Sequence, residues 1–294
     1  MPCDQSCSAA RRARDLVGEW LMTEIHFLDV GCGNMQLILL PDGSIFMYDC
    51  NITEDNEDDV LLYVKKIIGG STKIKVFINS HRDADHMRGI KKLHKKHPIQ
   101  AIWDSGVPGT TTTSPEYRDY MDLRRQLPSK EIEALTYRDY GTAVVRWMNS
   151  KWADYSDPND QSIVLKIEDH GASALLTGDT SFRPWKEKIL PKYSGGRLSA
   201  NILLASHHGS LTFFDDPANE KNYYTAHIKK ISPAMTLVSV GPNTHDLPDD
   251  KAMELYEKYS AGSDKGNKIH TTEDKGNMKL VLKDDGGWRL MVNQ

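Results

Sequence analysis

Four side chains able to bind metal ions fall within one short stretch of the chain: His81, Asp83, Asp85 and His86. An apolar run over residues 74–80 predicts a buried strand before them, and the apolar spacing within 87–96 predicts a helix after them. On such a loop, side chains two apart converge on one cation while the next pair faces a second. We therefore predict half of a dinuclear metal site. The alternative, a polar turn in which Asp85 caps the helix, accounts for neither histidine.

Two later segments supply the ligands that this loop lacks. The apolar run 174–178 ends at a Gly-Asp turn, where Asp179 can project from a sheet edge and bridge two cations. Another apolar run, 201–205, leads to paired histidines, of which we expect His207 to be the ligand and His208 a substrate contact or proton donor. Taken singly, Asp179 is equally well explained as a turn cap and His207 as a buried core histidine. Together with the first loop, both favour a metal site.

The order and spacing of these segments resemble the metallo-β-lactamase-fold hydrolases, and within them the domain attached to ComEC-type competence DNA-uptake proteins. Similar segments run through most of the chain, at residues 27–31, 41–43, 48–49, 81–86, 159–162, 176–179, 207–210, 239–243, 245 and 271–276. The resemblance implies an α/β fold, a four-layer αββα sandwich of two mixed β-sheets with metals at one edge. The predicted elements agree, because both faces of each sheet need burial.

The chain departs from the family pattern at several positions. Asp83 stands where the general superfamily has histidine, as in the ComEC-type pattern, and Asn159 stands where many relatives have histidine. Residues 31–34 read Gly-Cys-Gly-Asn instead of the usual Gly-Gln-Gly-Asp, and Arg88-Gly89 replaces a double glycine. The His-Pro pair near the end is stretched to residues 245–248.

The predicted ligand set is rich in oxygen donors and suits two divalent ions. Its members are His81, Asp83, Asp85, His86, Asn159, Asp179 and His207. Oxygen ligands shift preference toward hard cations, so we expect Mn²⁺, with Zn²⁺ or Mg²⁺ as alternatives. Asp179 would bridge the ions, and Asp85 would also orient the nucleophile. His208 or His245 would protonate the leaving oxygen.

The net charge of −4 argues against a globally basic nucleic-acid-binding protein, yet positive charge is concentrated locally. The helix predicted after the metal loop carries Arg88, Lys91, Lys92, Lys95 and Lys96. A phosphodiester backbone would require such charge beside the metals. We expect Arg88 and Ser210 to position a phosphate, with Lys91 and Lys92 as further substrate contacts. The alternative is a solvated basic face.

Three functions remain open. The first is a metal-dependent phosphodiesterase, most simply a nuclease that cleaves DNA by in-line attack of a metal-activated hydroxide. The second keeps the metals but hydrolyses a small ester, thioester or lactone, because the site and not the architecture sets the function. The third is a regulatory component of a defence or toxin system, with a protein partner.

Composition predicts a cytoplasmic globular enzyme. The chain has 294 residues, 39% of them hydrophobic, and no apolar run near the roughly 18 residues needed to cross a membrane. We expect an N-terminal extension over 1–21, with some helical character, and a single catalytic domain over 22–294. The four cysteines do not form a disulfide framework in a chain of this size, so reduced thiols are expected.

The apolar pattern predicts alternating strands and helices. Strands are expected near 24–30, 35–40, 44–49, 74–80, 100–103, 143–148, 162–168, 172–178, 201–205, 235–240 and 278–283. Helices are expected near 58–69, 87–96, 115–126, 217–231 and 249–260. The Thr/Ser stretch 110–114 and the Gly/Ser region 193–196 are expected to be mobile loops, either of which would serve as a lid.

Overall fold

The protein is built around two mixed β-sheets. The computed structural model describes residues 22–70, 72–149, 151–216, 218 and 223–293. One sheet has eight strands in the order β16-β15-β1-β2-β3-β5-β6-β7, and the other has seven in the order β14-β13-β12-β11-β10-β9-β8. The first sheet comprises β1 (Thr23–Phe27), β2 (Gln36–Leu39), β3 (Ile45–Tyr48), β5 (Val76–Ile78), β6 (Ile102–Asp104), β7 (Ser129–Glu131), β15 (Met278–Leu282) and β16 (Trp288–Met291).

The second sheet repeats this mixed character. It comprises β8 (Thr136–Tyr140), β9 (Ala143–Trp147), β10 (Leu165–Asp169), β11 (Ala172–Leu176), β12 (Ile202–Leu204), β13 (Met235–Val238) and β14 (Ile269–Thr271). Strands β11 to β14 pair in parallel, as do β3, β5, β6 and β7 of the first sheet. The remaining pairs are antiparallel.

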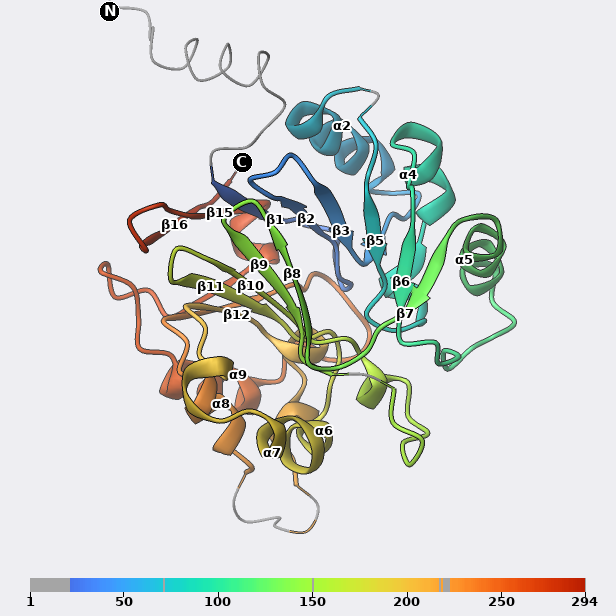
Figure 1. Ribbon diagram of the computed structural model, residues 1–294. Helices are drawn as coiled ribbons and strands as arrows, with labels where there is room; N and C mark the ends of the chain where they lie inside the picture. Colours follow the sequence, from blue (N-terminus) through green and yellow to red (C-terminus); the bar gives the residue numbers. More distant parts are fainter. Residues whose placement is uncertain (1–21, 71, 150, 217, 219–222, 294) are drawn as a thin grey trace, which may run out of the picture.

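Helices cover the outer face of each sheet. The first sheet is covered by α2 (Glu57–Ile68), α4 (Ile90–Lys96) and α5 (Pro115–Gln126), and the second by α6 (Phe182–Pro184), α7 (Leu190–Lys192), α8 (Ala226–Ile231) and α9 (Asp250–Tyr259) (Figure 1). Shorter elements are β4 (Cys50–Asn51), α3 (Ala84–Met87), α10 (Thr272–Lys275) and several single turns, among them η1 (Asn159–Gln161), η2 (Trp185–Ile189) and η4 (Ser206–Gly209). The predicted four-layer αββα sandwich is confirmed.

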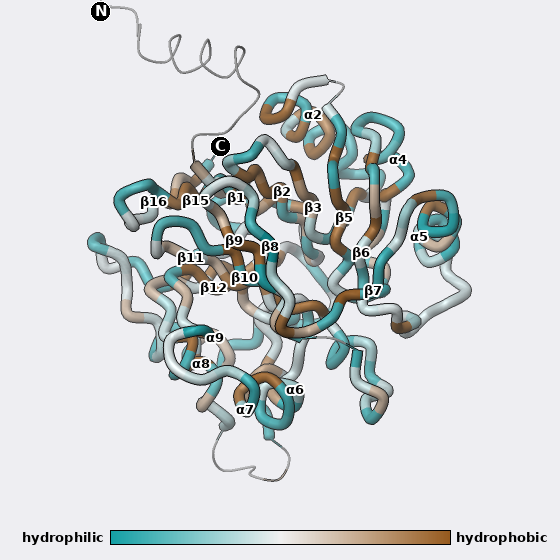
Figure 2. Tube along the Cα trace, in the orientation of Figure 1, coloured by the Kyte–Doolittle hydropathy of each residue, from teal (hydrophilic) through white to brown (hydrophobic). Residues whose placement is uncertain are grey.

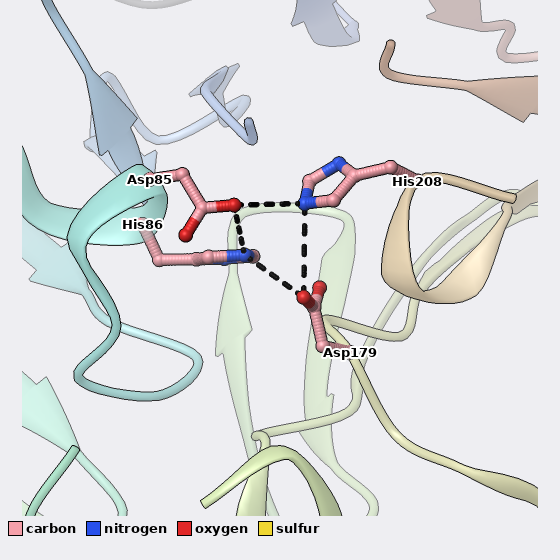
Figure 3. Close-up of side chains that lie close together, drawn as sticks. All are labelled: Asp85, His86, Asp179 and His208. Atoms are coloured by element: carbon pink, nitrogen blue, oxygen red, sulfur yellow. Dashed lines mark hydrogen bonds and ion pairs between the residues drawn. The ribbon is translucent and has the colours of Figure 1, made fainter. Parts of the chain in front are cut away.

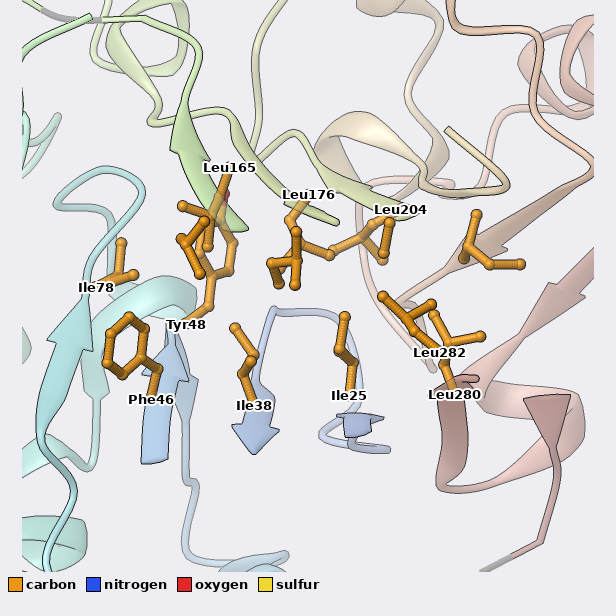
Figure 4. Packing of buried hydrophobic residues seen from close by; sticks show 14 of the residues in the cluster. Ile25, Ile38, Phe46, Tyr48, Ile78, Leu165, Leu176, Leu204, Leu280 and Leu282 are labelled. Atoms are coloured by element: carbon orange, nitrogen blue, oxygen red, sulfur yellow. The ribbon is translucent and has the colours of Figure 1, made fainter. Parts of the chain in front are cut away.

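The sheets pack against each other through alternating side chains. In β3, Phe46 and Tyr48 face the other sheet, whereas Ile45 and Met47 face the helices, as the two-residue period of a strand requires. Figure 4 shows the side chains of both sheets meeting in this layer, with Ile25, Ile38, Leu165, Leu176 and Leu204 among them. Figure 2 shows hydrophobic, brown stretches along strands of both sheets, whereas most of the connecting loops are teal or white.

The predicted helix over 87–96 is broken in the structure. Gly89 adopts φ 77°, and a Cβ atom at this position would lie 2.5 Å from the Cβ of Ile52. A residue with a side chain would therefore meet both backbone strain and a clash. The chain instead makes the short α3, turns at Gly89 and begins α4 at Ile90. Sequence periodicity did not reveal this turn.

Other expectations differ at element ends or lie outside the described residues. The predicted helix 217–231 is helical from Ala226 to Ile231, and residues 217 and 219–222 are not described. The proposed N-terminal extension, 1–21, also lies outside the described residues. Among the helices that the structure does describe, none combines the length and the apolar character needed to cross a membrane.

Candidate metal centre

The candidate site lies where the carboxyl ends of strands from both sheets meet. The loop with His81 and His86 follows β5, Asp179 follows β11, and the paired histidines follow β12. Carboxyl ends of parallel strands share one edge of a sheet, where loops gather side chains from distant parts of the sequence. The two sheets therefore deliver residues about a hundred positions apart to one place.

Four side chains form a compact cluster at this edge. Ligand-capable atoms of Asp85, His86, Asp179 and His208 all lie within 4.8 Å of one another. The Nε2 atom of His86 lies 3.2 Å from Oδ2 of Asp179, and Nε2 of His208 lies 3.1 Å from Oδ2 of Asp85 and 3.6 Å from Oδ2 of Asp179. Figure 3 shows the two imidazoles and two carboxylates converging on one space. Nitrogen and oxygen donors in this arrangement suit a divalent cation.

A second group of donors adjoins the first across Asp179. The Nε2 atom of His81 lies 3.9 Å from Oδ2 of Asp179 and 3.7 Å from Oδ2 of Asp83. Asn159, at the start of η1, lines the same cavity. Asp179 is thus the side chain shared by both groups, which is the position predicted for a bridging ligand.

Both histidines of the compact cluster are oriented by a hydrogen bond at Nδ1, the ring nitrogen that faces away from the cluster. The Nδ1 atom of His86 lies 2.8 Å from Oδ2 of Asp49, and Nδ1 of His208 lies 2.9 Å from the carbonyl oxygen of Ser239. Each Nδ1–H donates to this acceptor, so each Nε2 lone pair faces the cluster. Asp49 is fully buried and also accepts a bond from the Ser80 amide. Sequence reasoning gave Asp49 no role, although a carboxylate at the end of the apolar strand 45–48 was a usable signal.

The electrostatics of the cluster favour ionised carboxylates. Burial opposes ionisation of Asp179, but the neighbouring His86 and His208 outweigh it and hold the pKa of this carboxyl well below its usual range. The pKa of Asp85 is lowered for the same reasons. The pKa values of His86 and His208 are raised, since Asp179 and Asp85 outweigh the burial of the imidazoles. Without a metal, the two carboxylates are therefore paired with protons held on the imidazoles, and a bound cation would take the place of those protons.

The residues present fit bound divalent metal ions. Among the described residues, neither Oδ1 of Asn159 nor Oδ1 of Asp179 has a hydrogen-bond partner, although both atoms are buried. Buried polar atoms without partners are costly, so these two acceptors call for a ligand. They line a cavity of about 360 Å³ together with the histidines and carboxylates of both groups. Coordination of a metal ion would give both of these oxygen atoms a partner.

The comparisons with known proteins agree with this geometry. The model of the metallo-beta-lactamase superfamily matches residues 30–223, more than half of the chain. The chain belongs to the metallo-beta-lactamase superfamily. It is accordingly a metal-dependent hydrolase by family, with a candidate metal centre at the position described above.

The chain is also similar, at low identity, to a much longer protein. ComE operon protein 3 from Bacillus subtilis (strain 168) is 21% identical over 257 residues, which cover 81% of this chain and 31% of that protein. The chain therefore spans less than a third of this relative's length. This similarity agrees with the ComEC-type resemblance in the sequence.

Solved structures share the fold at low identity. CmlA, a diiron beta-hydroxylase from Streptomyces venezuelae, is 13% identical with a TM-score of 0.52, covering 89% of this chain and 54% of that protein. Igni18, a metallo hydrolase from Ignicoccus hospitalis KIN4/I, is 12% identical with a TM-score of 0.50, covering 87% and 98%. At these identities the likeness shows the metallo-beta-lactamase fold alone.

Most of the predicted site residues come together in the cavity. Its lining comprises Cys32, His81, Asp83, Asp85, Asn159, Asp179, His207, His208, Ser210, His245 and Leu247. His86 lies directly beneath, fully buried. The predicted site residues among them come from five separate segments of the sequence, and the fold brings them to one place.

The paired histidines are placed differently from the expectation. His208 is buried and joins the compact cluster, whereas the side chain of His207 is 28% exposed and its Nε2 lies 3.8 Å from Oδ2 of Asp179. Both residues have positive φ, 50° and 53°, within a tight turn. This turn points the second histidine inward and leaves the first at the cavity wall. The geometry therefore favours His208 over His207 as the inner ligand.

The basic residues expected to contact substrate do not line the cavity. The ammonium group of Lys91 lies 2.8 Å from Asp119 and 3.0 Å from Asp122, and that of Lys92 lies 2.5 Å from Glu57. Arg88 donates to Oδ1 of Asn51 at 2.9 Å. These cations lie on α4 and the preceding turn, where carboxylates of α2 and α5 neutralise the two lysines. The run of basic residues was visible in the sequence, but the carboxylates that pair with its lysines were not.

Proposed function

We propose that the chain is a metal-dependent phosphodiesterase that cleaves DNA. The observation that carries the proposal is the pair of donor groups on either side of Asp179, since two adjacent cations are suited to in-line displacement at a phosphate. The resemblance of the sequence to ComEC-type domains supports DNA as the phosphodiester. The nearby carboxylates would repel such an anion, so substrate binding should depend wholly on bound metal.

Each residue then has a defined task. Asp85, His86 and His208 would hold one ion, His81, Asp83 and Asn159 the other, and Asp179 both. Bound ions of this kind bind the scissile phosphate and lower the pKa of a coordinated water.

His207 remains free for proton transfer at the cavity wall. Its Nδ1 contacts the hydroxyl of Thr212 at 3.3 Å, while Nε2 faces Asp179. We assign His207 the donation of a proton to the leaving oxygen, in place of His208, with His245 as a second candidate. Ser210, which also lines the cavity, would position the phosphate.

The oxygen-rich donor set supports Mn²⁺ as the native metal. Carboxylates and an amide outnumber imidazoles in the group around His81, and hard donors suit Mn²⁺ or Mg²⁺. Zn²⁺ is the alternative for the group around His208, which offers two imidazoles.

A second candidate function is hydrolysis of a small ester, thioester or lactone. The observation that favours it is the cavity wall, because no lysine or arginine is among its described lining residues. A volume of about 360 Å³ also lies within the range of small-molecule pockets.

The deciding experiment separates binding of metal from turnover. Metal-stripped protein is resupplied with Mn²⁺, Mg²⁺ or Zn²⁺ and assayed on labelled single- and double-stranded DNA, and in parallel on a small ester, thioester and lactone. The variants are Asp179→Ala, His207→Gln and His208→Gln, with Asp264→Ala, which lies outside this cavity, as the control.

The proposal expects metal-dependent DNA cleavage by the wild type and the control, and none by Asp179→Ala. His208→Gln should lose metal, whereas His207→Gln should keep it and turn over about 10²- to 10⁴-fold more slowly. Turnover of the small substrates alone, with metal bound, would replace the nuclease by the second candidate. Metal loss in His207→Gln and not in His208→Gln would reverse the two histidine roles.

A further inference from the structure

The two donor groups differ in their chemistry and in how firmly their side chains are oriented, and we expect them to differ in metal affinity. We propose that the metal centre fills in two unequal steps: the cluster of Asp85, His86, Asp179 and His208 first, and the group around Asp83 second, with Thr110 setting the affinity of the second step. This inference rests on the proposed metal centre but not on the identity of the substrate.

The first group is the more preorganised. Its four donor atoms already lie within 4.8 Å of one another. Two of its members are imidazoles whose Nδ1 atoms are fixed by a buried carboxylate and a backbone carbonyl. Such partners orient a metal-binding histidine, fix its tautomer and raise its basicity. Little reorganisation is therefore needed to bind the first ion.

The second group has poorer metal donors, and fewer hydrogen bonds orient its side chains. It offers one imidazole, His81, and the neutral amide oxygen of Asn159, a poorer donor than a second imidazole or a carboxylate. Within the described part of the chain, the hydroxyl of Ser80, at 3.1 Å, is the one hydrogen-bond partner of Nδ1 of His81, and that hydroxyl already donates to Asp49 at 2.7 Å. The remaining ligand, Asp83, has a side chain that is 22% exposed. Its orientation must come from elsewhere.

Thr110 supplies this orientation. Its backbone N–H donates to Oδ1 of Asp83 at 2.7 Å, and its hydroxyl donates to Oδ2 at 2.8 Å. The two bonds fix the plane of the carboxylate, and each occupies one lone pair of an oxygen that must also face the metal. The stretch 110–114, expected to be a mobile lid, is thus tied to the metal loop at its first residue.

The loop that contains Gly109 lies so close to the metal loop that no side chain fits at this position. A Cβ atom on Gly109 would lie 1.8 Å from the carbonyl oxygen of Arg82 and 2.9 Å from Oδ1 of Asp83. Only glycine permits this approach, which brings the Thr110 amide onto the carboxylate. Thr110 is therefore a positioning residue for the second ion, acting through Asp83.

The test measures stoichiometry and affinity, not turnover. Metal-stripped full-length protein is titrated with Mn²⁺ by calorimetry, and the first and second ions are distinguished by electron paramagnetic resonance. The variants are Thr110→Val, which removes the hydroxyl but keeps the amide, and Asn159→His, which adds an imidazole. Thr112→Val is the matched control, because it makes the same change two residues along the same exposed stretch.

The wild type and Thr112→Val should bind two ions with affinities at least tenfold apart. Thr110→Val should weaken the second step by about 10- to 100-fold and leave the first unchanged, and Asn159→His should strengthen the second step. Two equal affinities in the wild type, or a Thr110→Val change confined to the first step, would overturn the inference. Failure to bind any metal would remove the proposed function as well, whereas a failed DNA assay has no bearing on this readout.

Discussion

At the scale of single residues, the site depends on side chains that do not touch the metal themselves. Asp49 is the clearest case. It accepts hydrogen bonds from the amide and hydroxyl of Ser80 and from Nδ1 of His86, all in a fully buried position. It therefore joins the strand end, the metal loop and a ligand into one unit, and its charge keeps Nε2 of His86 available for coordination.

Replacing Asp49 by Asn should weaken metal binding. The amide keeps the size of the side chain but removes the charge that orients His86, so metal affinity should fall by about 10- to 100-fold. Competition with a fluorescent chelator measures the affinity, and circular dichroism checks that the variant is folded. Asp55→Asn, at an exposed position, is the control. An unchanged affinity in folded Asp49→Asn would show that the carboxylate is dispensable.

Residue types were more predictable than their orientation. Clustered histidines and aspartates after apolar strands are visible in the sequence, and the cavity contains them. Which of His207 and His208 faces inward was not predictable, because it depends on the left-handed backbone of the turn between them. The neutralisation of Lys91 was hidden for a different reason, since its partners lie on another helix.

At the scale of elements, a buried ionic network ties the metal loop to β6 and α5. Asp104, at the end of β6, is fully buried and accepts from Arg82 at 2.9 Å, from Tyr120 at 2.6 Å and from Arg124 at 2.7 Å. Burial opposes ionisation of Asp104, but Arg124 and Arg82 outweigh it and lower its pKa. Since Arg82 lies between two of the proposed ligands, this network helps to hold the metal loop.

Adjacent arginines on α5 provide a matched test of this network. Arg124→Ala removes a partly buried partner of Asp104 and should lower the free energy of unfolding by about 1.5–3 kcal/mol. Arg125→Ala removes an exposed partner of Asp122, at a side chain that is 64% exposed, and should change it by less than about 0.5 kcal/mol. Urea denaturation of both variants gives the comparison. Equal effects would mean that the network adds no stability beyond a surface pair.

Elements with clear local signals were predicted well. Helix α5 was predicted over the residues that it occupies, and the structure shows clear local signals at its start, since Ser114 caps it and Pro115 begins it. Strands β7, β8, β14 and β16 were not predicted. Strand β7 and most of β8 are exposed and lack an apolar run, and only their pairing with neighbouring strands makes them strands. Tertiary context of this kind is absent from local periodicity.

At the scale of the whole molecule, the helical layer on the outer face of the second sheet contains a buried titratable group. His227 on α8 is fully buried among aromatic rings, including those of Trp185 and Phe213. Its Nε2–H donates to the carbonyl oxygen of Phe213 at 2.7 Å, and Nδ1 has no hydrogen-bond partner among the described residues. Burial lowers the pKa of this imidazole to about 3, so the folded protein holds it neutral.

This histidine should make the fold sensitive to mild acid. The unfolded chain binds a proton at His227 below about pH 6.5, whereas the folded chain does not bind it until about pH 3. The free energy of unfolding is therefore unaffected by this group above about pH 6.5 and falls as the pH is lowered from there toward about pH 3. Between about pH 7.5 and pH 5 the loss from this one group is about 2 kcal/mol.

His227→Gln isolates this contribution, because glutamine can donate to the same carbonyl but does not titrate. Other groups titrate in both proteins alike, so the informative quantity is the difference in unfolding free energy between wild type and variant at each pH, measured on metal-free protein. That difference should shrink by about 2 kcal/mol on going from about pH 7.5 to pH 5. A difference independent of pH would mean that the folded protein takes up the proton at His227, by opening the aromatic layer of α8 to water without unfolding.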